Sequence, residues 1–520
     1  MSLDNSVNNK RIAKNTILLY VRMLFIMAVQ LYTSRVVLNT LGVVDYGLYN
    51  VVGGIVTMFA FLNGAMVTST QRYVTFELGK GNLQRLKEVF TTCVQIHLLI
   101  SLIIIILAES VGLWFLYEKM VIPEDRFSAA MWVYQLSILT MCVQVMSVPY
   151  NSDIVAHEQM GIFAEITVVE VLLKLLIVFL LVFGDFDKLA LYSVLIACVQ
   201  LFVQFLYKTY CNHHFPESKI IKTFDVRLVK EISKFIGWNI WGNLAATLFT
   251  TGLNLLLNMF FGPIVNAARA IAVQVETAIS QFSTNFLMAV NPQITKLYAQ
   301  NNLQEMHKLI FRASKFTFML LFILSLPVLI ETETILTIWL KLVPDYTVVF
   351  LRLLIGIIII DSVARPLMTA AAATGNVKLY QSLIGGILLS IVPIAYVVLK
   401  MGGTPASVYV VHLIICAIAF LTRLFVIRPM IHLSLKLYFS SVVLRCALVL
   451  AVSLPLSFLA KSLLPEGIFS TILVCSACVI LASATSYLLG LSNSERQFVH
   501  TKSSEIVHKL SRYVHDSNHR

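Results

Sequence analysis

The chain has 520 residues, of which 58% are hydrophobic and only 13% are charged, and its formal net charge is +12. Soluble domains carry about 25% charged residues, so this composition excludes a soluble globular enzyme. The apolar runs are continuous, as in residues 98–107 and 172–183, which argues against the alternating strands of an outer-membrane β-barrel. We therefore expect an all-α polytopic membrane protein whose basic excess lies in cytoplasmic loops and does not mark a nucleic-acid partner.

The apolar segments predict the membrane spans, because a spanning helix needs about 20 mostly apolar residues. About fourteen such segments follow one another, joined by short loops and without a soluble domain. They cover residues 13–38, 47–70, 89–116, 127–149, 162–184, 189–210, 236–260, 264–290, 316–338, 348–372, 379–399, 406–427, 441–461 and 467–490. The first is too long for a signal peptide, so we interpret it as a retained span. With the N-terminus in the cytoplasm, most Lys and Arg residues fall in cytoplasmic segments, which predicts that both termini are cytoplasmic.

An internal repeat organises the chain. Residues 79–90 resemble residues 299–310, and the offset of 220 residues places Asn82-Leu83-Gln84 on Asn302-Leu303-Gln304. The same offset aligns Gly42 with Gly262, so that in both halves a Gly turn is expected between the first two spans. An even number of spans per repeat predicts two parallel six-helix lobes. We expect an N-lobe at 1–215, a C-lobe at 216–427, and two further helices with a cytoplasmic tail at 428–520.

Ionisable residues inside spans cost about 2.5–3.5 kcal/mol at mid-helix, so each needs an explanation. Glu170 with Lys174 and Asp361 with Arg365 are spaced i,i+4, and each pair can neutralise itself. Two arginines have no such local partner. Arg22 lies ~14 Å into the first predicted span, and Arg269 lies ~9 Å into the eighth, with its nearest acid, Glu276, two turns away.

Polar residues form stripes on predicted spans 1 and 2, which open the first repeat, and on predicted spans 7 and 8, which open the second. Arg22 lies in the stripe of span 1 and Arg269 in that of span 8. Such stripes serve either as contacts between helices or as walls of a wet cavity, and we favour the cavity. The candidate substrate-binding residues are Arg22, Arg269, Gln30, Asn50, Asn239, Asn243, Asn254 and Asn266. The candidate coupling residues are Glu276, Glu170 and Asp361.

The sequence offers no motif for an enzyme or a metal site. It lacks a Gly-rich phosphate loop, His-Glu-x-x-His and Gly-x-Ser-x-Gly, so we expect a transporter without catalytic residues. Cys211, His213 and His214 lack a fourth ligand nearby, so no metal is expected. No cofactor is expected either. Because an ATP-binding motif is absent, transport would use a gradient of H⁺, of Na⁺ or of the substrate itself.

Three segments carry a resemblance to a known family: Asn15–Tyr20, Leu38–Asn50 and Phe261–Ala272. They resemble bacterial polysaccharide-biosynthesis flippases, the O-antigen (Wzx-type) and capsule repeat-unit transporters of the multidrug/oligosaccharidyl-lipid/polysaccharide (MOP) superfamily. The resemblance implies a MATE-like fold with two lobes in a V around a central cavity, walled by helices 1, 2, 7 and 8. It implies transport of undecaprenyl-pyrophosphate-linked oligosaccharide across the bacterial inner membrane for O-antigen, capsule or exopolysaccharide synthesis. A polysaccharide polymerase and glycosyltransferases would be its partners.

The resemblance also bears on the arginines. Related lipid flippases place cavity arginines on helices 1, 2 and 8, and Arg22 and Arg269 match the first and the last of these, whereas predicted span 2 contains no arginine. Together, Arg22 and Arg269 are expected to bind one diphosphate. A cation-coupled multidrug exporter on the same fold is the alternative, and it would need an acidic cavity. A membrane polymerase or glycosyltransferase is disfavoured, because no predicted outside loop is large enough for catalysis.

Overall fold

The computed structural model describes residues 2–57, 60–118, 122–181, 187–340, 343–465, 467–493 and 495–497, and these are helical apart from short turns and loops. The expected all-α class is confirmed. Helices dominate because in lipid every backbone N–H and C=O must be bonded within its own segment. The α-helices are α1 (Ser2–Thr57), α2 (Ala60–Lys80), α3 (Leu83–Leu107), α4 (Leu113–Glu118), α5 (Phe127–Ala156), α6 (Met160–Leu180), α7 (Lys188–His214), α8 (Val226–Phe261), α9 (Pro263–Ala299), α10 (Leu303–Ile330), α11 (Thr332–Leu340), α12 (Thr347–Ala373), α13 (Lys378–Leu389), α14 (Ile391–Lys400), α15 (Pro405–Ile431), α16 (Leu435–Tyr438), α17 (Leu444–Ser462) and α18 (Ile468–Thr485).

Eleven segments of the described chain are long and apolar enough to cross a membrane. They match all the predicted spans except 2, 5 and 8, so the protein is a multi-pass membrane protein, while the expected number of fourteen spans is not confirmed. Helices do occupy two of the exceptions, since α6 covers predicted span 5 and α9 covers predicted span 8. Both helices carry charged side chains: Glu165, Glu170 and Lys174 lie in α6, and Arg269 and Glu276 lie in α9.

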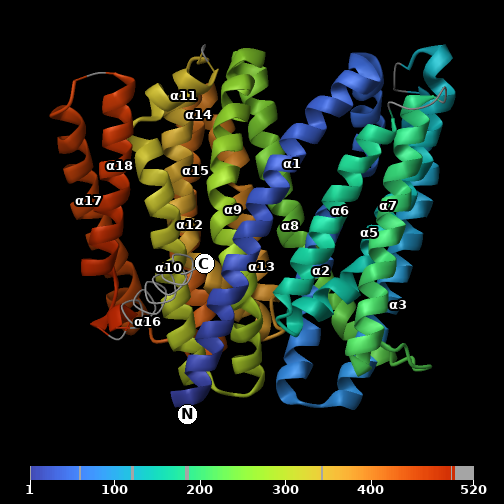
Figure 1. The fold of residues 1–520 in the computed structure, drawn as a ribbon. Helices are drawn as coiled ribbons and strands as arrows, with labels where there is room; N and C mark the ends of the chain where they lie inside the picture. The colour runs from blue at the N-terminus through green and yellow to red at the C-terminus, as the bar shows by residue number, and fades with distance from the viewer. Residues whose placement is uncertain are drawn as a thin grey trace, which may run out of the picture. The chain divides into compact units, whose positions relative to one another are not determined.

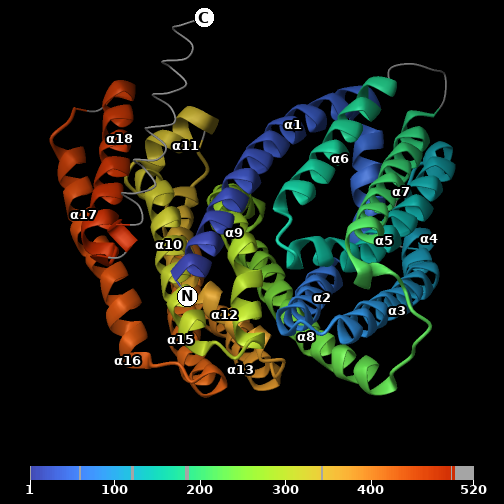
Figure 2. The same cartoon turned by 60° about the horizontal axis from the view of Figure 1, so that its bottom comes forward.

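The helices form two compact units. The first unit contains the residues up to Gly252 together with Thr284–Met306 and Leu367–Ser390, and the second contains Leu253–Ser283, His307–Pro366 and the residues from Ile391 onward. The lobe boundaries at 215 and 427 stay predictions. In the first unit, α5 packs along α7 and α1 packs along α6. In the second unit, α17 and α18 lie side by side (Figures 1 and 2).

The repeat is visible in the turns that precede α3 and α10. Gly81 and Asn301, 220 residues apart, both have positive φ, at 73° and 56°. The next residue caps the following helix in each case. The side-chain oxygen of Asn82 accepts from the Arg85 N–H at 3.0 Å, and that of Asn302 accepts from the Glu305 N–H at 3.3 Å. An Asn cap satisfies one of the free N–H groups at a helix start, which explains why this Asn recurs in both halves.

The Gly turn expected between the first two spans of each half occurs only in the second half. Gly262 has φ 78° and separates α8 from α9, which begins at Pro263. In the first half, α1 runs through Gly42 to Thr57, so the expected break there is wrong. The two halves differ in the next residue: Pro263 follows Gly262 and begins α9, whereas Val43 follows Gly42, and proline is favoured at the first position of a helix.

Candidate functional site

Arg22 is half-buried on α1 and faces α6 within the first unit. Its guanidinium carbon lies 4.4 Å from the centre of the Phe163 ring, a cation–π contact. Glu170, which binds Lys174 at 2.6 Å, and Tyr207 are close enough to interact electrostatically with Arg22. Arg22 therefore has a carboxylate in its surroundings, although α1 supplies none. Its Nε is buried and has no hydrogen-bond partner among the described residues.

Arg269 belongs to the second unit, where the structure joins it to another predicted site residue. Its Nη1 donates to the side-chain oxygen of Asn254 at 3.3 Å, so the contact links α9 to α8 across the turn at Gly262. Tyr409 and His412 of α15 also interact electrostatically with Arg269. These neighbours are polar groups that orient the guanidinium.

Asn239 and Asn243 make contacts between helices of the first unit. Asn239 is buried, donates to the Phe235 carbonyl at 2.9 Å and accepts from the Gln381 amide at 3.1 Å. The Asn243 amide nitrogen lies 3.1 Å from the position that a Cβ on Gly64 would take, so α2 and α8 approach closely there. Such contacts are typical of polar groups that hold membrane helices together. This role is the alternative to a role in the wall of a cavity.

The other predicted substrate residues differ in exposure. Gln30 is exposed on α1. Asn266 is half-buried, and its side-chain oxygen has no hydrogen-bond partner among the residues that the structure describes. The side chain of Asn50 lies outside the described part of the chain. The role of all these residues in substrate binding stays a prediction.

The coupling candidates are bound to local partners. Glu276 accepts from the Ser280 hydroxyl at 2.8 Å, and the Thr277 hydroxyl lies 3.4 Å from its other oxygen. The two pairs expected from i,i+4 spacing are present: Glu170 with Lys174 at 2.6 Å and Asp361 with Arg365 at 3.6 Å.

Asp361 has a stronger partner that the sequence did not reveal. Arg423 of α15 binds its other oxygen at 2.6 Å, and the Arg423 side chain is only 5% exposed. The two residues lie 62 positions apart, so helix packing and not local spacing creates this pair. The only sequence signal is an arginine inside the apolar run of α15. Asp361 is thereby balanced by two arginines.

We expect Asp361→Asn to lower the thermal stability of the purified protein. Removing one partner of a buried ion pair costs about 3–5 kcal/mol, and we expect roughly 2 kcal/mol here, because the Asp361 side chain is 29% exposed. A second change, Arg423→Met, removes the stranded cation and should recover much of the loss. Glu170→Gln is the matched control and should cost under about 1 kcal/mol, since Lys174 is more exposed. Equal melting temperatures of Asp361→Asn and wild type would contradict this account.

A buried glutamate organises the turn between α5 and α6. The Glu158 side chain is 0% exposed and binds Arg11 of α1 at 2.7 Å and Lys296 of α9 at 2.7 Å. Gln293 donates to the same carboxylate at 2.7 Å, and the Asn15 amide donates to the Glu158 carbonyl at 3.0 Å. Within the first unit, Glu158, between predicted spans 4 and 5, thus connects the start of the chain to the end of α9.

A second connection in this unit joins α2 to the end of α12. Arg72 donates from Nε and Nη2 to the Ala373 carbonyl, at 3.3 and 3.0 Å. Its guanidinium lies 4.4 Å from the centre of the Tyr73 ring and 4.6 Å from that of Phe76. The Arg72 guanidinium also lies close to Gly375, because a Cβ at that position would be 2.6 Å from Nη2. The repeat relates the two connections. One joins α9 to the residue Glu158 just after α5, and the other joins α2 to the end of α12. Both α2 and α9 precede an Asn-capped turn.

Comparison with known proteins identifies the fold. No protein-family model and no curated protein matches the sequence. An outward-facing MATE family multidrug-resistance transporter of the MOP superfamily matches with a TM-score of 0.69 at 12% identity, over 82% of this chain and 96% of that one. A Vibrio cholerae MATE transporter matches with 0.66 at 16%, over 84% and 99%. A MOP superfamily transporter from Pyrococcus furiosus, described as having a binding pocket of reversed polarity, matches with 0.65 at 14%, over 81% and 96%.

At these identities the likeness establishes the fold and not the substrate. The chain has the fold of a MATE-like membrane transporter, as expected from its sequence. Its structural neighbours are transporters of the MOP superfamily, which agrees with the expected class of a transporter.

Proposed function

We propose that the protein is a flippase for lipid-linked oligosaccharides. It moves undecaprenyl-pyrophosphate-linked repeat units from the inner to the outer leaflet of the bacterial inner membrane by alternating access, with both termini in the cytoplasm. The units feed the synthesis of O-antigen, capsule or exopolysaccharide, and the partners are a polymerase and glycosyltransferases. The proposal rests on the MATE-like fold and on one observation, the presence of Arg22 and Arg269 within the long helices α1 and α9.

Arginine suits a diphosphate for a physical reason. A pyrophosphate that crosses ~30 Å of hydrocarbon must be neutralised or kept wet. The planar guanidinium is always charged and binds two phosphate oxygens through parallel hydrogen bonds. Asn254 orients Arg269, and the Phe163 ring orients Arg22, whose Nε has no hydrogen-bond partner among the described residues. The P. furiosus neighbour, whose reversed pocket polarity is taken to suggest a different function, is a precedent for this fold with altered charge.

A cation-coupled multidrug exporter is the second candidate, because a structural neighbour is described as a multidrug-resistance transporter. An exporter of cationic drugs needs acids that are free to bind the drug. The acids inside the spans support this reading less well, since Glu170 is paired with Lys174 and Asp361 with two arginines. Glu276 is the candidate that remains for coupling to H⁺ or Na⁺.

Reconstituted vesicles distinguish the two candidates. We expect the purified protein to move undecaprenyl-pyrophosphoryl-N-acetylglucosamine to the outer leaflet, detected by its modification with an impermeant galactosyltransferase. Vesicles with undecaprenyl-linked sugar that lacks the diphosphate are the control and should show no movement. Proton-driven or sodium-driven uptake of ethidium, with no movement of the diphosphate lipid, would instead establish the exporter.

A further inference from the structure

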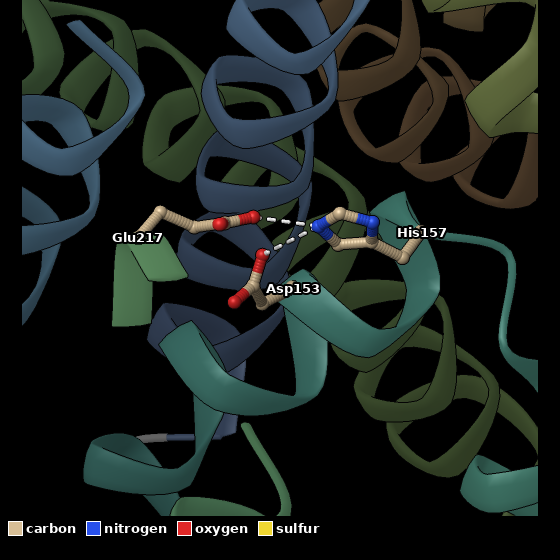
Figure 3. A group of neighbouring side chains, drawn as sticks. All are labelled: Asp153, His157 and Glu217. Atoms are coloured by element: carbon tan, nitrogen blue, oxygen red, sulfur yellow. Dashed lines mark hydrogen bonds and ion pairs between the residues drawn. The ribbon is translucent and has the colours of Figure 1, made fainter. Parts of the chain in front are cut away.

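A cluster of metal-binding side chains lies at the end of α5, away from the predicted substrate and coupling residues. Asp153 stands in the last turn of α5, His157 caps that helix, and Glu217 belongs to the short 3-10 helix Pro216–Ser218 that follows α7. Figure 3 shows both carboxylates turned toward Nε2 of His157. The Glu217 oxygen lies 2.6 Å and the Asp153 oxygen 3.8 Å from this nitrogen. One ligand atom from each residue lies within 4.8 Å of the others.

Two carboxyl groups are buried in this cluster without a fixed cation in the described part of the chain. The side chains of Asp153 and Glu217 are 0% and 1% exposed. Among the residues that the structure describes, their ion pairs are with His157 only. Both oxygens of Asp153 are buried without a hydrogen-bond partner. The C-terminal end of a helix also carries partial negative charge, so an acid in the last turn of α5 adds to an unfavourable field.

We propose that Asp153, His157 and Glu217 bind a divalent transition-metal ion such as Zn²⁺ or Mn²⁺. Two carboxylates and a neutral imidazole balance the charge of such an ion, so the buried site becomes neutral. Carboxylate and imidazole are established ligands for both metals. In a tetrahedral site with bonds of about 2.1 Å, ligand atoms stand roughly 3.4 Å apart. The observed separations of 2.6 and 3.8 Å bracket this value, so small side-chain rotations complete the site.

The surroundings of His157 support a preformed ligand. Its ring stacks on Phe215 with centroids 4.0 Å apart and planes 5° apart, which fixes the direction of Nε2. The His157 side chain is 24% exposed, which gives an ion a path to the otherwise buried carboxylates. The sequence did not reveal the site, because Glu217 lies 60 residues from His157 and only the packing of α5 on α7 brings them together.

Metal binding to the purified full-length chain tests the proposal. We expect about one equivalent of Zn²⁺ or Mn²⁺ per chain in equilibrium dialysis, with a rise in melting temperature on addition of the metal salt alone. Asp153→Asn and Glu217→Gln keep the side-chain volume and should weaken binding at least about tenfold. His157→Gln should do the same. The isosteric variants keep the packing, and size-exclusion chromatography shows whether each is folded.

Two control variants locate the metal. Cys211→Ser removes a buried thiol near both carboxylates, and the double change His213→Gln with His214→Gln removes histidines at the end of α7. Both should bind metal as the wild type does. Equal affinities of wild type, Asp153→Asn and Glu217→Gln would overturn the proposal. Dissociation constants above 1 mM for both Zn²⁺ and Mn²⁺, a binding free energy weaker than roughly −4 kcal/mol, would overturn it too. A protonated His157 would then be the only counter-charge of the carboxylates.

Discussion

Arg22→Ala and Arg269→Ala should each abolish export of surface polysaccharide without loss of the protein from the membrane. Each variant removes one charge-assisted contact to the diphosphate, which is worth about 1.5–3 kcal/mol. We therefore expect the affinity of the purified protein for undecaprenyl pyrophosphate to fall roughly 10- to 150-fold. The affinity is measured by quenching of intrinsic tryptophan fluorescence, and export by surface polysaccharide in cells that depend on this transporter.

Further variants separate charge from geometry. Arg22→Lys keeps the charge but loses the planar pair of donors, so partial activity would indicate charge alone and near-complete loss would indicate bidentate binding. Arg352→Ala is the matched control: this arginine lies near the end of a predicted span and donates to the Thr332 hydroxyl at 3.2 Å, so it should leave binding unchanged. Normal export by both folded alanine variants would show that neither arginine binds the substrate.

Local spacing predicted the features that depend on neighbours along one helix. Continuous apolar runs predicted the helices, because lipid leaves the backbone no other way to satisfy its hydrogen bonds. Spacing i,i+4 predicted the Glu170–Lys174 and Asp361–Arg365 pairs, since helix geometry alone brings such residues together. The repeated Asn-Leu-Gln corresponds to a repeated capped turn before α3 and α10.

Contacts between distant segments escaped prediction. Arg423 reaches Asp361, and Glu217 reaches His157, only because helices that are far apart in sequence pack together. The same limit explains Arg22, which has no acid near it on α1 but approaches Glu170 of α6. The number of spans stays a prediction, because α6 and α9 carry charged side chains and are not among the eleven segments that are clearly able to cross a membrane.

Glu158→Gln should destabilise the region of the first unit where α1, α9 and the α5–α6 turn are in contact. If the protein works by the alternating access proposed above, some contacts must break in each cycle, and the buried Glu158 with its two cations is suited to this role. Glu158 has φ 60°, a conformation that favours glycine, and the turn after α12 has Gly375 with φ 78°. The ion pairs of Glu158 compensate for this backbone strain of about 1–2 kcal/mol.

The loss of the carboxylate charge acts mainly through Lys296. Burial lowers the pKa of the Lys296 amine, and the nearby Glu158 opposes this effect. With Gln at 158, the buried amine loses its counter-charge, which costs about 3 kcal/mol, or roughly a hundredfold in the equilibrium for local opening of this contact. We expect faster hydrogen exchange in the first turns of α1 and the last turns of α9, measured by mass spectrometry, together with altered transport.

A double-mutant cycle decides whether the ion pair itself holds this end closed. Lys296→Met alone leaves Glu158 bound to Arg11 and Gln293, so its effect should be smaller than that of Glu158→Gln. Combining the two changes removes the stranded amine and should recover part of the protection. Glu165→Gln alters an exposed carboxylate of α6 and serves as the control. If Glu158→Gln exchanges and transports as the wild type does, this contact does not control the cycle, and the connection between Arg72 and Ala373 becomes the one that must break.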